Sequence, residues 1–505
     1  MKATSRKLSR RLALALCAAA ALWAAAAPCA LARQDAPPEA REPRPAAQAP
    51  PPAQPAQAPQ AAQASQAAQT PQAADAPRLV AALEGYEGPS LMSGRRVLAV
   101  FSPDGRTLAL SGPKRAVGLY DAATGRLLHT LSAERDADGF NGFSFSPDSR
   151  VAATRNVPDR SVSLWDVATG RLLLKLPGRD RDIETKFKAA NTPAEEFVAV
   201  PFSPDGRVVL TEREDDVVVG WEVATGRELF RLEHKTETNA AGDVLGALFF
   251  SGALHPLMMS AAYSPDGARL VTANGDKNPK LWDAATGRLV ATLASPGDYV
   301  YAAAFLPAAG GLVTVSFKGE ANLWDASTGA HRQKLARDAG DKFVFEIGHD
   351  GGRLALSPDG RLVAARVEDG KTDEVKIWDA ADGRTLATLG KDESDLLAFS
   401  PDGRTLAAAG GDKRATAQLL DAATGRPRLA LARTDGGARA LAFSPDGRLV
   451  VTTGGRGVRL WDAETGAPVA TLDRARFPAH FSPDGRRLVT GGTDKTAYLY
   501  EIPGR

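Results

Sequence analysis

Histidine and acidic side chains are the groups of this 505-residue sequence that could carry out catalysis or hold a metal ion. The six histidines are scattered without the spacing of metal ligands: His129, His234, His255, His331, His349 and His480. No G-x-S-x-G elbow, Walker loop or dinucleotide-binding fingerprint occurs in a supporting context. The acidic run "TEREDD", from Thr211, lies in an expected loop and is typical of a solvated surface. The sequence therefore predicts no catalytic residue, no metal and no cofactor.

The first 32 residues have the pattern of a secretory signal peptide. Five basic residues precede residue 12, an apolar stretch covers residues 12–27, and an A-x-A cleavage pattern stands at residues 30–32. This apolar stretch is shorter than the roughly 20 residues that a membrane-spanning helix needs. We expect cleavage after Ala32 and export to the periplasm or the exterior, by the general secretory or the twin-arginine route.

Removal of this segment changes both the chemistry and the charge of the chain. Cys17 and Cys29 lie within it, so the mature chain holds no thiol for a disulfide, a metal site or a nucleophile. The loss of its five basic residues takes the formal net charge from +2 to −3. Nucleic-acid-binding domains usually carry a basic excess, so this charge argues against a nucleic-acid partner.

Residues 33–77 consist almost entirely of alanine, proline and glutamine. Without branched aliphatic or aromatic side chains, such a segment cannot bury enough apolar surface to offset the entropy lost on ordering. We expect a disordered linker. It serves either as a spacer between the envelope and a folded domain or as a passive leader.

Two short motifs alternate nine times from residue 78 onward. The first is Ser-Pro-Asp-Gly, which begins at Ser102, Ser203, Ser264, Ser357, Ser400, Ser444 and Ser482, with a near copy from Ser146 and a degenerate one from Leu306. The second is "LWDAATG" or a variant of it, which begins at Leu119, Leu164, Gly220, Leu281, Leu323, Ile377, Leu419, Leu460 and Leu499. Because the two series stay in register, each unit is expected to form the same supersecondary structure.

Both motifs have the chemistry of tight turns. In Ser-Pro-Asp-Gly, the proline presets φ near −65° and the glycine takes the left-handed conformation that closes a hairpin. In Asp-Ala-Ala-Thr-Gly, the aspartate can accept hydrogen bonds from the following amides. Apolar runs of strand length, such as "RLVVTTG" and "GVRLW", separate the turns. Each unit of roughly 40 residues therefore predicts four strands, which is one blade of a β-propeller.

The alternating motifs resemble the WD-repeat (WD40) β-propeller family, here of an exported bacterial type, in which Trp-Asp ends the third strand of each blade. That family often joins a His, a Ser or Thr, an Asp and the Trp in a buried hydrogen-bonded network. The resemblance implies one full set with a structural role, formed by His255, Thr272, Asp276 and Trp282. Other units keep parts of it, such as Asp159 with Trp165.

The two ends of the repeat region are expected to interlock. The last unit stops at residue 505 with three strands, and residues 78–83, "RLVAAL", match five of the six letters of the fourth strand "RLVATL" at residues 288–293. Pairing of the N-terminal strand with the last blade would cover an edge that otherwise invites aggregation. We therefore expect an all-β propeller over residues 78–505 with nine four-stranded blades, the alternative being eight blades and an appended unit.

Function is expected where the repeats differ. The two turn motifs share one face of the disc and hardly vary, whereas the connections on the opposite face differ most at residues 177–198 and 233–260. The uncharged segment "VLGALFFSGALHPLMM", residues 244–259, is either a buried excursion or an apolar docking patch. The candidate partner-binding residues are Phe187, Leu245, Leu248, Phe249, Phe250, Leu254 and Met258.

These features favour an exported, non-enzymatic scaffold that binds a protein partner through the variable face of the propeller. The alternatives are an enzyme or small-ligand binder that uses the central channel, and a passive component of the envelope. We expect no insertion of the mature chain into a membrane, although the linker would permit association with the envelope.

Overall fold

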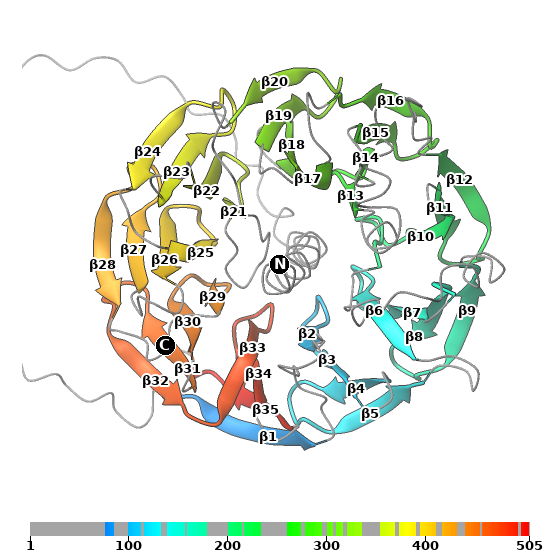
Figure 1. Cartoon of the computed structure of the whole chain (residues 1–505). Helices are drawn as coiled ribbons and strands as arrows, with labels where there is room; N and C mark the ends of the chain where they lie inside the picture. The colour runs from blue at the N-terminus through cyan, green and yellow to red at the C-terminus, as the bar shows by residue number, and fades with distance from the viewer. Residues whose placement is uncertain are drawn as a thin grey trace, which may run out of the picture.

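Nine antiparallel β-sheets stand like blades around a central axis and form a closed ring (Figure 1). The computed structural model describes residues 76–84, 99–112, 116–132, 139–156, 159–178, 200–214, 217–233, 260–273, 278–294, 300–306, 310–316, 321–335, 354–368, 373–389, 394–410, 417–431, 440–454, 457–492 and 496–503. Every regular element in these ranges is a β-strand. The prediction of a nine-bladed all-β propeller is therefore confirmed, and the eight-bladed alternative is wrong.

Each blade runs from an inner strand at the axis to an outer strand at the rim (Figure 1). The inner strands are β2 (Ala99–Phe101), β6 (Phe140–Phe145), β13 (Ser260–Tyr263), β17 (Val300–Leu306), β21 (Leu354–Leu356), β25 (Ser394–Phe399), β29 (Ala440–Phe443) and β33 (Ala475–Phe481). The second strands are β3 (Thr107–Ser111), β7 (Val151–Asn156), β10 (Val208–Glu214), β14 (Arg269–Ala273), β18 (Gly311–Ser316), β22 (Leu362–Glu368), β26 (Thr405–Gly410), β30 (Leu449–Gly454) and β34 (Arg487–Gly492).

The third and outer strands complete the blades. The third strands are β4 (Val117–Asp121), β8 (Val162–Asp166), β11 (Val217–Glu222), β15 (Lys280–Asp283), β19 (Ala321–Asp325), β23 (Asp373–Asp379), β27 (Ala417–Asp421), β31 (Gly457–Asp462) and β35 (Thr496–Glu501). The outer strands are β5 (Leu127–Leu131), β9 (Leu172–Leu176), β12 (Glu228–Glu233), β16 (Leu289–Thr292), β20 (His331–Lys334), β24 (Thr385–Leu389), β28 (Pro427–Leu431), β32 (Pro468–Leu472) and β1 (Arg78–Glu84).

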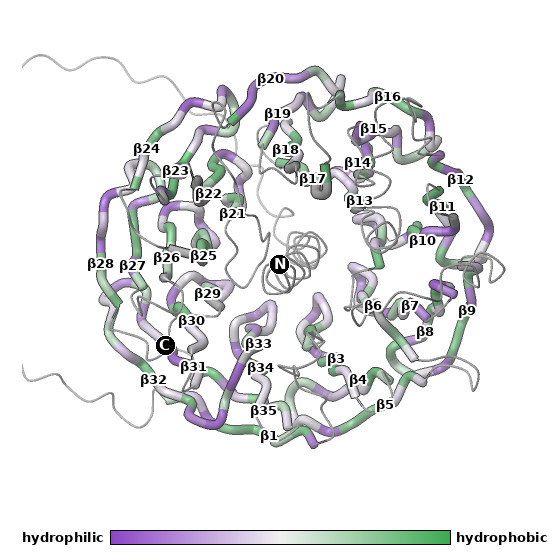
Figure 2. The backbone as a smooth tube through the Cα atoms, viewed as in Figure 1, coloured by the Kyte–Doolittle hydropathy of each residue, from purple (hydrophilic) through white to green (hydrophobic). Residues whose placement is uncertain are grey.

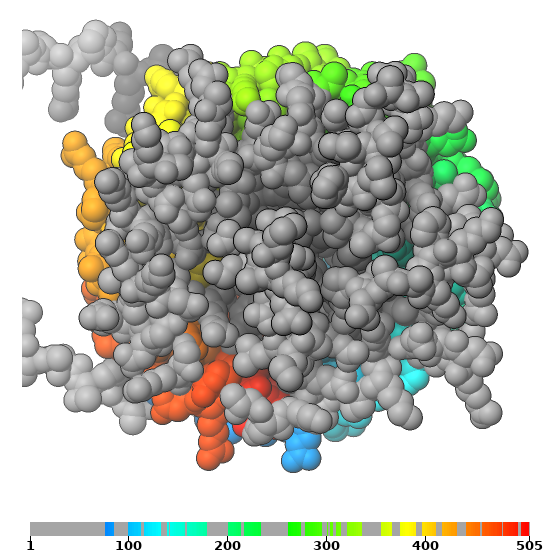
Figure 3. Space-filling view, viewed as in Figure 1, coloured from blue at the N-terminus to red at the C-terminus, as the bar shows by residue number. Residues whose placement is uncertain are grey.

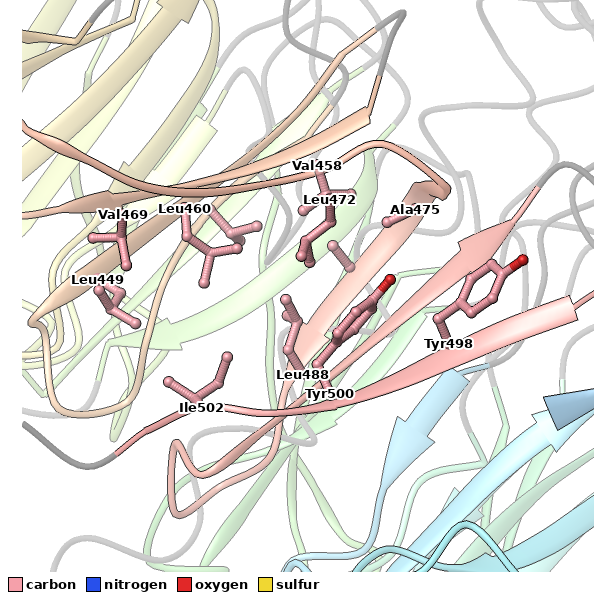
Figure 4. Packing of buried hydrophobic residues seen from close by; sticks show 12 residues of the cluster. Leu449, Val458, Leu460, Val469, Leu472, Ala475, Leu488, Tyr498, Tyr500 and Ile502 are labelled. Atoms are coloured by element: carbon pink, nitrogen blue, oxygen red, sulfur yellow. The ribbon is translucent and has the colours of Figure 1, made fainter. Parts of the chain in front are cut away.

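The core lies between neighbouring blades. Second strands such as β3 are buried along their whole length, because a blade packs against each of their faces. Between the eighth and ninth blades, Leu449, Leu460 and Val469 meet Leu488 and Tyr500 (Figure 4). Hydropathy follows this arrangement, since the middle strands are largely hydrophobic whereas the outer strand β20 is hydrophilic (Figure 2).

The outer strands form the rim of the disc, where coloured segments are visible in Figure 3, and each pairs with a described strand on one side only. In all nine blades the pairing of the third and outer strands contains a β-bulge near the start of the outer strand. A bulge interrupts the regular row of N–H and C=O groups that another strand would need for pairing. The repeat therefore carries its own protection against edge-to-edge aggregation.

The ring closes through β1, as expected. This strand pairs antiparallel with β35, from Arg78 opposite Glu501 to Glu84 opposite Thr496. Arg78 Nε donates to a carboxylate oxygen of Glu501 at 3.0 Å. Leu83 is 3% exposed and packs between the ninth and first blades. The N-terminal strand thus supplies the outer strand that the last blade lacks.

The third blade differs from the expected four strands. Its sheet contains β10, β11 and β12, and the inner strand is reduced among the described residues to an isolated bridge between Phe202 and Val209. Pro201 immediately precedes this bridge and has no N–H to donate to a ladder. The backbone of Pro201 still accepts a hydrogen bond from Leu210 N at 2.9 Å, so the chain keeps its position beside β10.

Candidate functional site

The Ser-Pro-Asp-Gly turns join the inner and second strands and satisfy their polar groups internally. In the first blade, Ser102 Oγ donates to Asp104 Oδ1 at 2.6 Å and accepts from Thr107 N at 2.9 Å. Gly105 has φ of 71° and donates its N–H to Ser102 O at 2.8 Å. The serine-to-aspartate bond recurs in all eight such turns, which begin at Ser102, Ser146, Ser203, Ser264, Ser357, Ser400, Ser444 and Ser482.

These turns also touch one another around the axis. A Cβ atom at Gly105 would lie 3.7 Å from Cδ of Pro483 in the preceding blade, and one at Gly447 would lie 3.6 Å from Cδ of Pro401. The same contact joins Gly206 to Pro147, Gly267 to Pro204, and Gly485 to Pro445. The motif therefore repeats for two reasons, because each copy closes its own hairpin and packs against the next copy.

The Asp-Ala-Ala-Thr-Gly turns lie on the same face as the Ser-Pro-Asp-Gly turns, as expected. In the first blade Ala122 N donates to Arg106 O at 2.9 Å, and the equivalent bond ties the two turns together in all nine blades. Asp121 Oδ1 accepts from Thr124 N at 2.8 Å and from Thr124 Oγ1 at 2.6 Å. This face, called the turn face below, is uniform and internally hydrogen-bonded.

The turn aspartates are expected to make the stability of the propeller depend on pH in acid. A hydrogen bond from the threonine hydroxyl is the largest cause that lowers the pKa of Asp121, Asp166, Asp283 and Asp421, and the Ser327 hydroxyl does the same for Asp325. A lowered folded-state pKa contributes stability above the unfolded-state value, and that stability is lost as the pH falls.

We expect a melting temperature that is nearly constant down to about pH 5 and falls steeply below about pH 4, near the ordinary pKa of Asp. Calorimetry across this range measures the effect. The Asp121→Asn variant keeps an acceptor oxygen without titrating, so its stability should fall less with acid than that of the parent chain. A melting temperature that stays flat from pH 5 to pH 3 would contradict a contribution from these carboxylates.

Buried tryptophans are bonded to threonines across the second and third strands. The Nε1 of Trp282 donates to Thr272 Oγ1 at 2.9 Å, and four further pairs have the same bond. These are Trp165 with Thr154, Trp221 with Thr211, Trp324 with Thr314, and Trp461 with Thr452. His255 and Asp276 lie outside the described residues, so the four-membered network stays a prediction. Asp159 accepts from Ser161 instead of joining Trp165, and Trp165 bonds to Thr154, a partner that was not predicted.

Two buried threonines should respond differently to the same substitution. Thr452→Val removes the acceptor of Trp461 Nε1 and leaves a buried N–H without a partner, which costs about 1–3 kcal/mol. Thr490 occupies the equivalent place in the ninth blade, where Tyr500 replaces the tryptophan, and its buried hydroxyl has no partner among the described residues. Thr490→Val should therefore leave the free energy of unfolding unchanged or raise it.

Urea unfolding of the two valine variants and the parent chain measures both effects. The midpoint should fall for Thr452→Val alone, with the slope unchanged. Equal midpoints for the two variants would show that the Trp–Thr bond does not stabilise the blade.

The opposite face, called the loop face below, carries a buried ion pair between the second and third blades. Arg160 is 4% exposed, and its Nη1 donates to Glu212 Oε2 at 2.9 Å. Arg155 Nη2 lies 3.6 Å from the same oxygen. Glu212 belongs to the run "TEREDD", which was expected to be solvated. That expectation is wrong for its first residues, because Thr211 bonds Trp221 and Glu212 pairs with Arg160 inside the blade interface.

The connection between β7 and β8 holds Arg160 in an uncommon conformation. Its φ is 55°, a left-handed value that few residues other than glycine adopt. Asp159 Oδ1 accepts from Ser161 Oγ at 2.8 Å, and Asn156 Nδ2 donates to Ser161 Oγ at 2.8 Å. At the start of the first long connection, a Cβ atom at Gly178 would lie 2.0 Å from Asp159 O, so only glycine fits there. This hydrogen-bonded cluster fixes the base of that connection.

The predicted partner-binding residues lie outside the described residues: Phe187, Leu245, Leu248, Phe249, Phe250, Leu254 and Met258. The first long connection runs from the second blade to the third, and the second runs from the third blade to the fourth. These three blades are consecutive in the ring (Figure 1). Within the described ranges, no three or more His, Cys, Asp or Glu side chains are grouped so as to hold a metal ion. The part of the chain that the structure describes also contains no helix that could span a membrane.

Comparison with known proteins agrees with this architecture. Residues 249–283, 429–462 and 467–501 match the family described as WD domain, G-beta repeat. Together with the nine-bladed ring, these matches support a WD40 propeller. No curated protein sequence matches the chain.

A solved structure shows the same fold at low sequence identity. A structure titled as the eukaryotic initiation factor is 15% identical, with a TM-score of 0.53 over 77% of this chain and 90% of that chain. A computationally designed protein, Ika8, is 21% identical, with a TM-score of 0.47 over 74% of this chain and 97% of that chain.

Proposed function

We propose that the protein is an exported, non-enzymatic scaffold that binds another protein through the loop face of its propeller. WD40 propellers commonly mediate interactions between proteins. The observation that carries the proposal is the contrast between the two faces. The polar side chains of the turn face are bonded within their own turns, whereas the longest connections leave the loop face from three consecutive blades.

The ion pair between the second and third blades supports this surface. Arg160, Glu212 and Arg155 join the two blades at the loop face, beside the residues where the first long connection starts. A binding site held by rigid elements loses less entropy when a partner binds. The seam between these blades is therefore suited to present both connections to one partner.

The course of the chain favours the same face. Arg78 lies opposite Glu501 at the turn face, so β1 begins on that side of the propeller. If the linker joins the domain to the envelope, the loop face points away from the attachment and stays accessible. Export itself rests on the signal-peptide pattern of residues 1–32.

Replacement of residues 237–254 by a short Gly-Ser linker tests the proposal. We expect the variant to lose its partner in affinity purification from the native envelope, read by mass spectrometry, while its melting temperature changes little. The matched control replaces residues 411–416, a loop-face connection of the seventh blade, and should keep the partner. N-terminal sequencing of the same native preparation should begin at Arg33.

Three outcomes would count against the proposal. If the 237–254 variant unfolds, the segment belongs to the core rather than to a binding surface. If it stays folded and still captures the partner, the working surface lies elsewhere. A native chain that starts at Met1 would contradict cleavage of the signal peptide.

A further inference from the structure

β1 is held differently from every other outer strand. The other eight outer strands follow their third strand through a tight turn in the chain, whereas β1 reaches β35 without any such turn. Its seven residues include one deeply buried large side chain, Leu83, while Leu79 is 48% exposed. Val80 and Ala81 are partly buried against the same cluster, and backbone pairing and the Arg78–Glu501 ion pair add further contacts. Because no turn ties β1 to β35, this strand could leave its sheet without a change in the chain path of the other three strands of the blade.

The edge of β35 forms a specific acceptor for this strand. Leu83 packs into an apolar cluster between the ninth and first blades that includes Leu108 and Leu499. At the other end of the strand, Glu501 Oε2 accepts a hydrogen bond from Arg78 Nε. The other carboxylate oxygen, Oε1, accepts one from Arg487 Nη1 at 3.1 Å. The acceptor therefore recognises an extended strand with an arginine at its start and a leucine five residues later.

We propose that the edge of β35 also binds β1 of a second copy of this chain, so that two molecules can exchange their closing strands. A strand from a second copy would make the same contacts in the same register. Residues 85–98 join β1 to the first blade, and a chain of that length can span up to about 50 Å when extended. The strand β1 of the same chain competes for the edge of β35 at an effective concentration in the millimolar range. Exchange with a second copy should therefore appear at high protein concentration.

Engineered cysteines in the full chain test this exchange. Cys17 and Cys29 are replaced by serine, and Glu84→Cys is placed in one chain and Thr496→Cys in another, because these two residues face each other in the β1–β35 register. The chains are mixed at high concentration, incubated and oxidised. We expect the mixed disulfide dimer to exceed the dimers of either chain with itself by about tenfold, since exchange brings the two sites together.

Two controls make the result decisive. Thr385→Cys, on the exposed start of β24, replaces Glu84→Cys in a matched mixture and sets the background of random collisions. A single chain with both Glu84→Cys and Thr496→Cys should form an internal disulfide, and this closed chain should no longer exchange. Mixed dimers at the background level would overturn the proposal, and so would failure of the internal disulfide to form.

Discussion

Deletion of residues 78–84 will lower the melting temperature of the propeller and cause it to associate, whereas deletion of residues 33–77 will do neither. The first deletion removes β1, uncovers β35 and empties the pocket of Leu83. Leu83→Ala alone should cost about 2–5 kcal/mol, the usual range for a buried leucine. An uncovered strand edge pairs readily with other chains.

Calorimetry and light scattering after gel filtration measure the two deletions side by side. The linker deletion serves as the control, because it shortens the chain upstream of β1 without removing any strand. Equal melting temperatures and equal masses for the two truncated chains would show that β1 does not close the ring.

Arg160→Ala will destabilise the propeller by about 3 kcal/mol. Glu212 would then keep a largely buried carboxylate without its closest partner, and removal of one member of a buried ion pair has a cost of this size. Arg361→Ala is the matched control, because it removes an arginine from a solvent-exposed ion pair. The Arg361 side chain is 77% exposed, and its Nε lies 3.8 Å from Asp359 Oδ2. That substitution should change the free energy of unfolding by less than about 1 kcal/mol.

Arg160→Gly separates the charge from the backbone conformation. Glycine adopts φ of 55° without strain, so this variant should recover part of the stability that is lost in Arg160→Ala. The comparison is made by urea unfolding of all three variants. If Arg160→Ala and Arg361→Ala lose equally little stability, the ion pair does not hold the second and third blades together.

The parts of the fold that depend on local chemistry could be predicted from the sequence. Proline, aspartate and glycine at fixed offsets define each turn, and the period of the two motifs gives the number of blades. The match between residues 78–83 and 288–293 was enough to place β1, because every outer strand follows one pattern. Pro201 also carried a local signal, since it cannot donate to a strand ladder, but a uniform repeat was assumed for the third blade.

Features that depend on tertiary contact could not be predicted in this way. Arg160 and Glu212 are 52 residues apart, and nothing near either residue indicates the other. The run that contains Glu212 has the composition of a solvated loop, and only its place in β10 turns the side chain into the blade interface. Thr154 could have been found from the motif, because it stands 11 residues before Trp165, close to the spacing of 10 residues between Thr211 and Trp221.

Arg78 and Glu501 are neighbours in the ninth blade, so the two ends of the propeller lie close enough to be joined. The first described residues and the last ones leave the ring side by side, because β1 and β35 are antiparallel neighbours. A short peptide that joined residue 503 to residue 77 would connect β35 to β1 through the chain. In every other blade, a turn already connects the third and outer strands in this way. New chain ends could then be opened between any two blades. The fold would therefore tolerate a circularly permuted chain that begins in any of the nine blades.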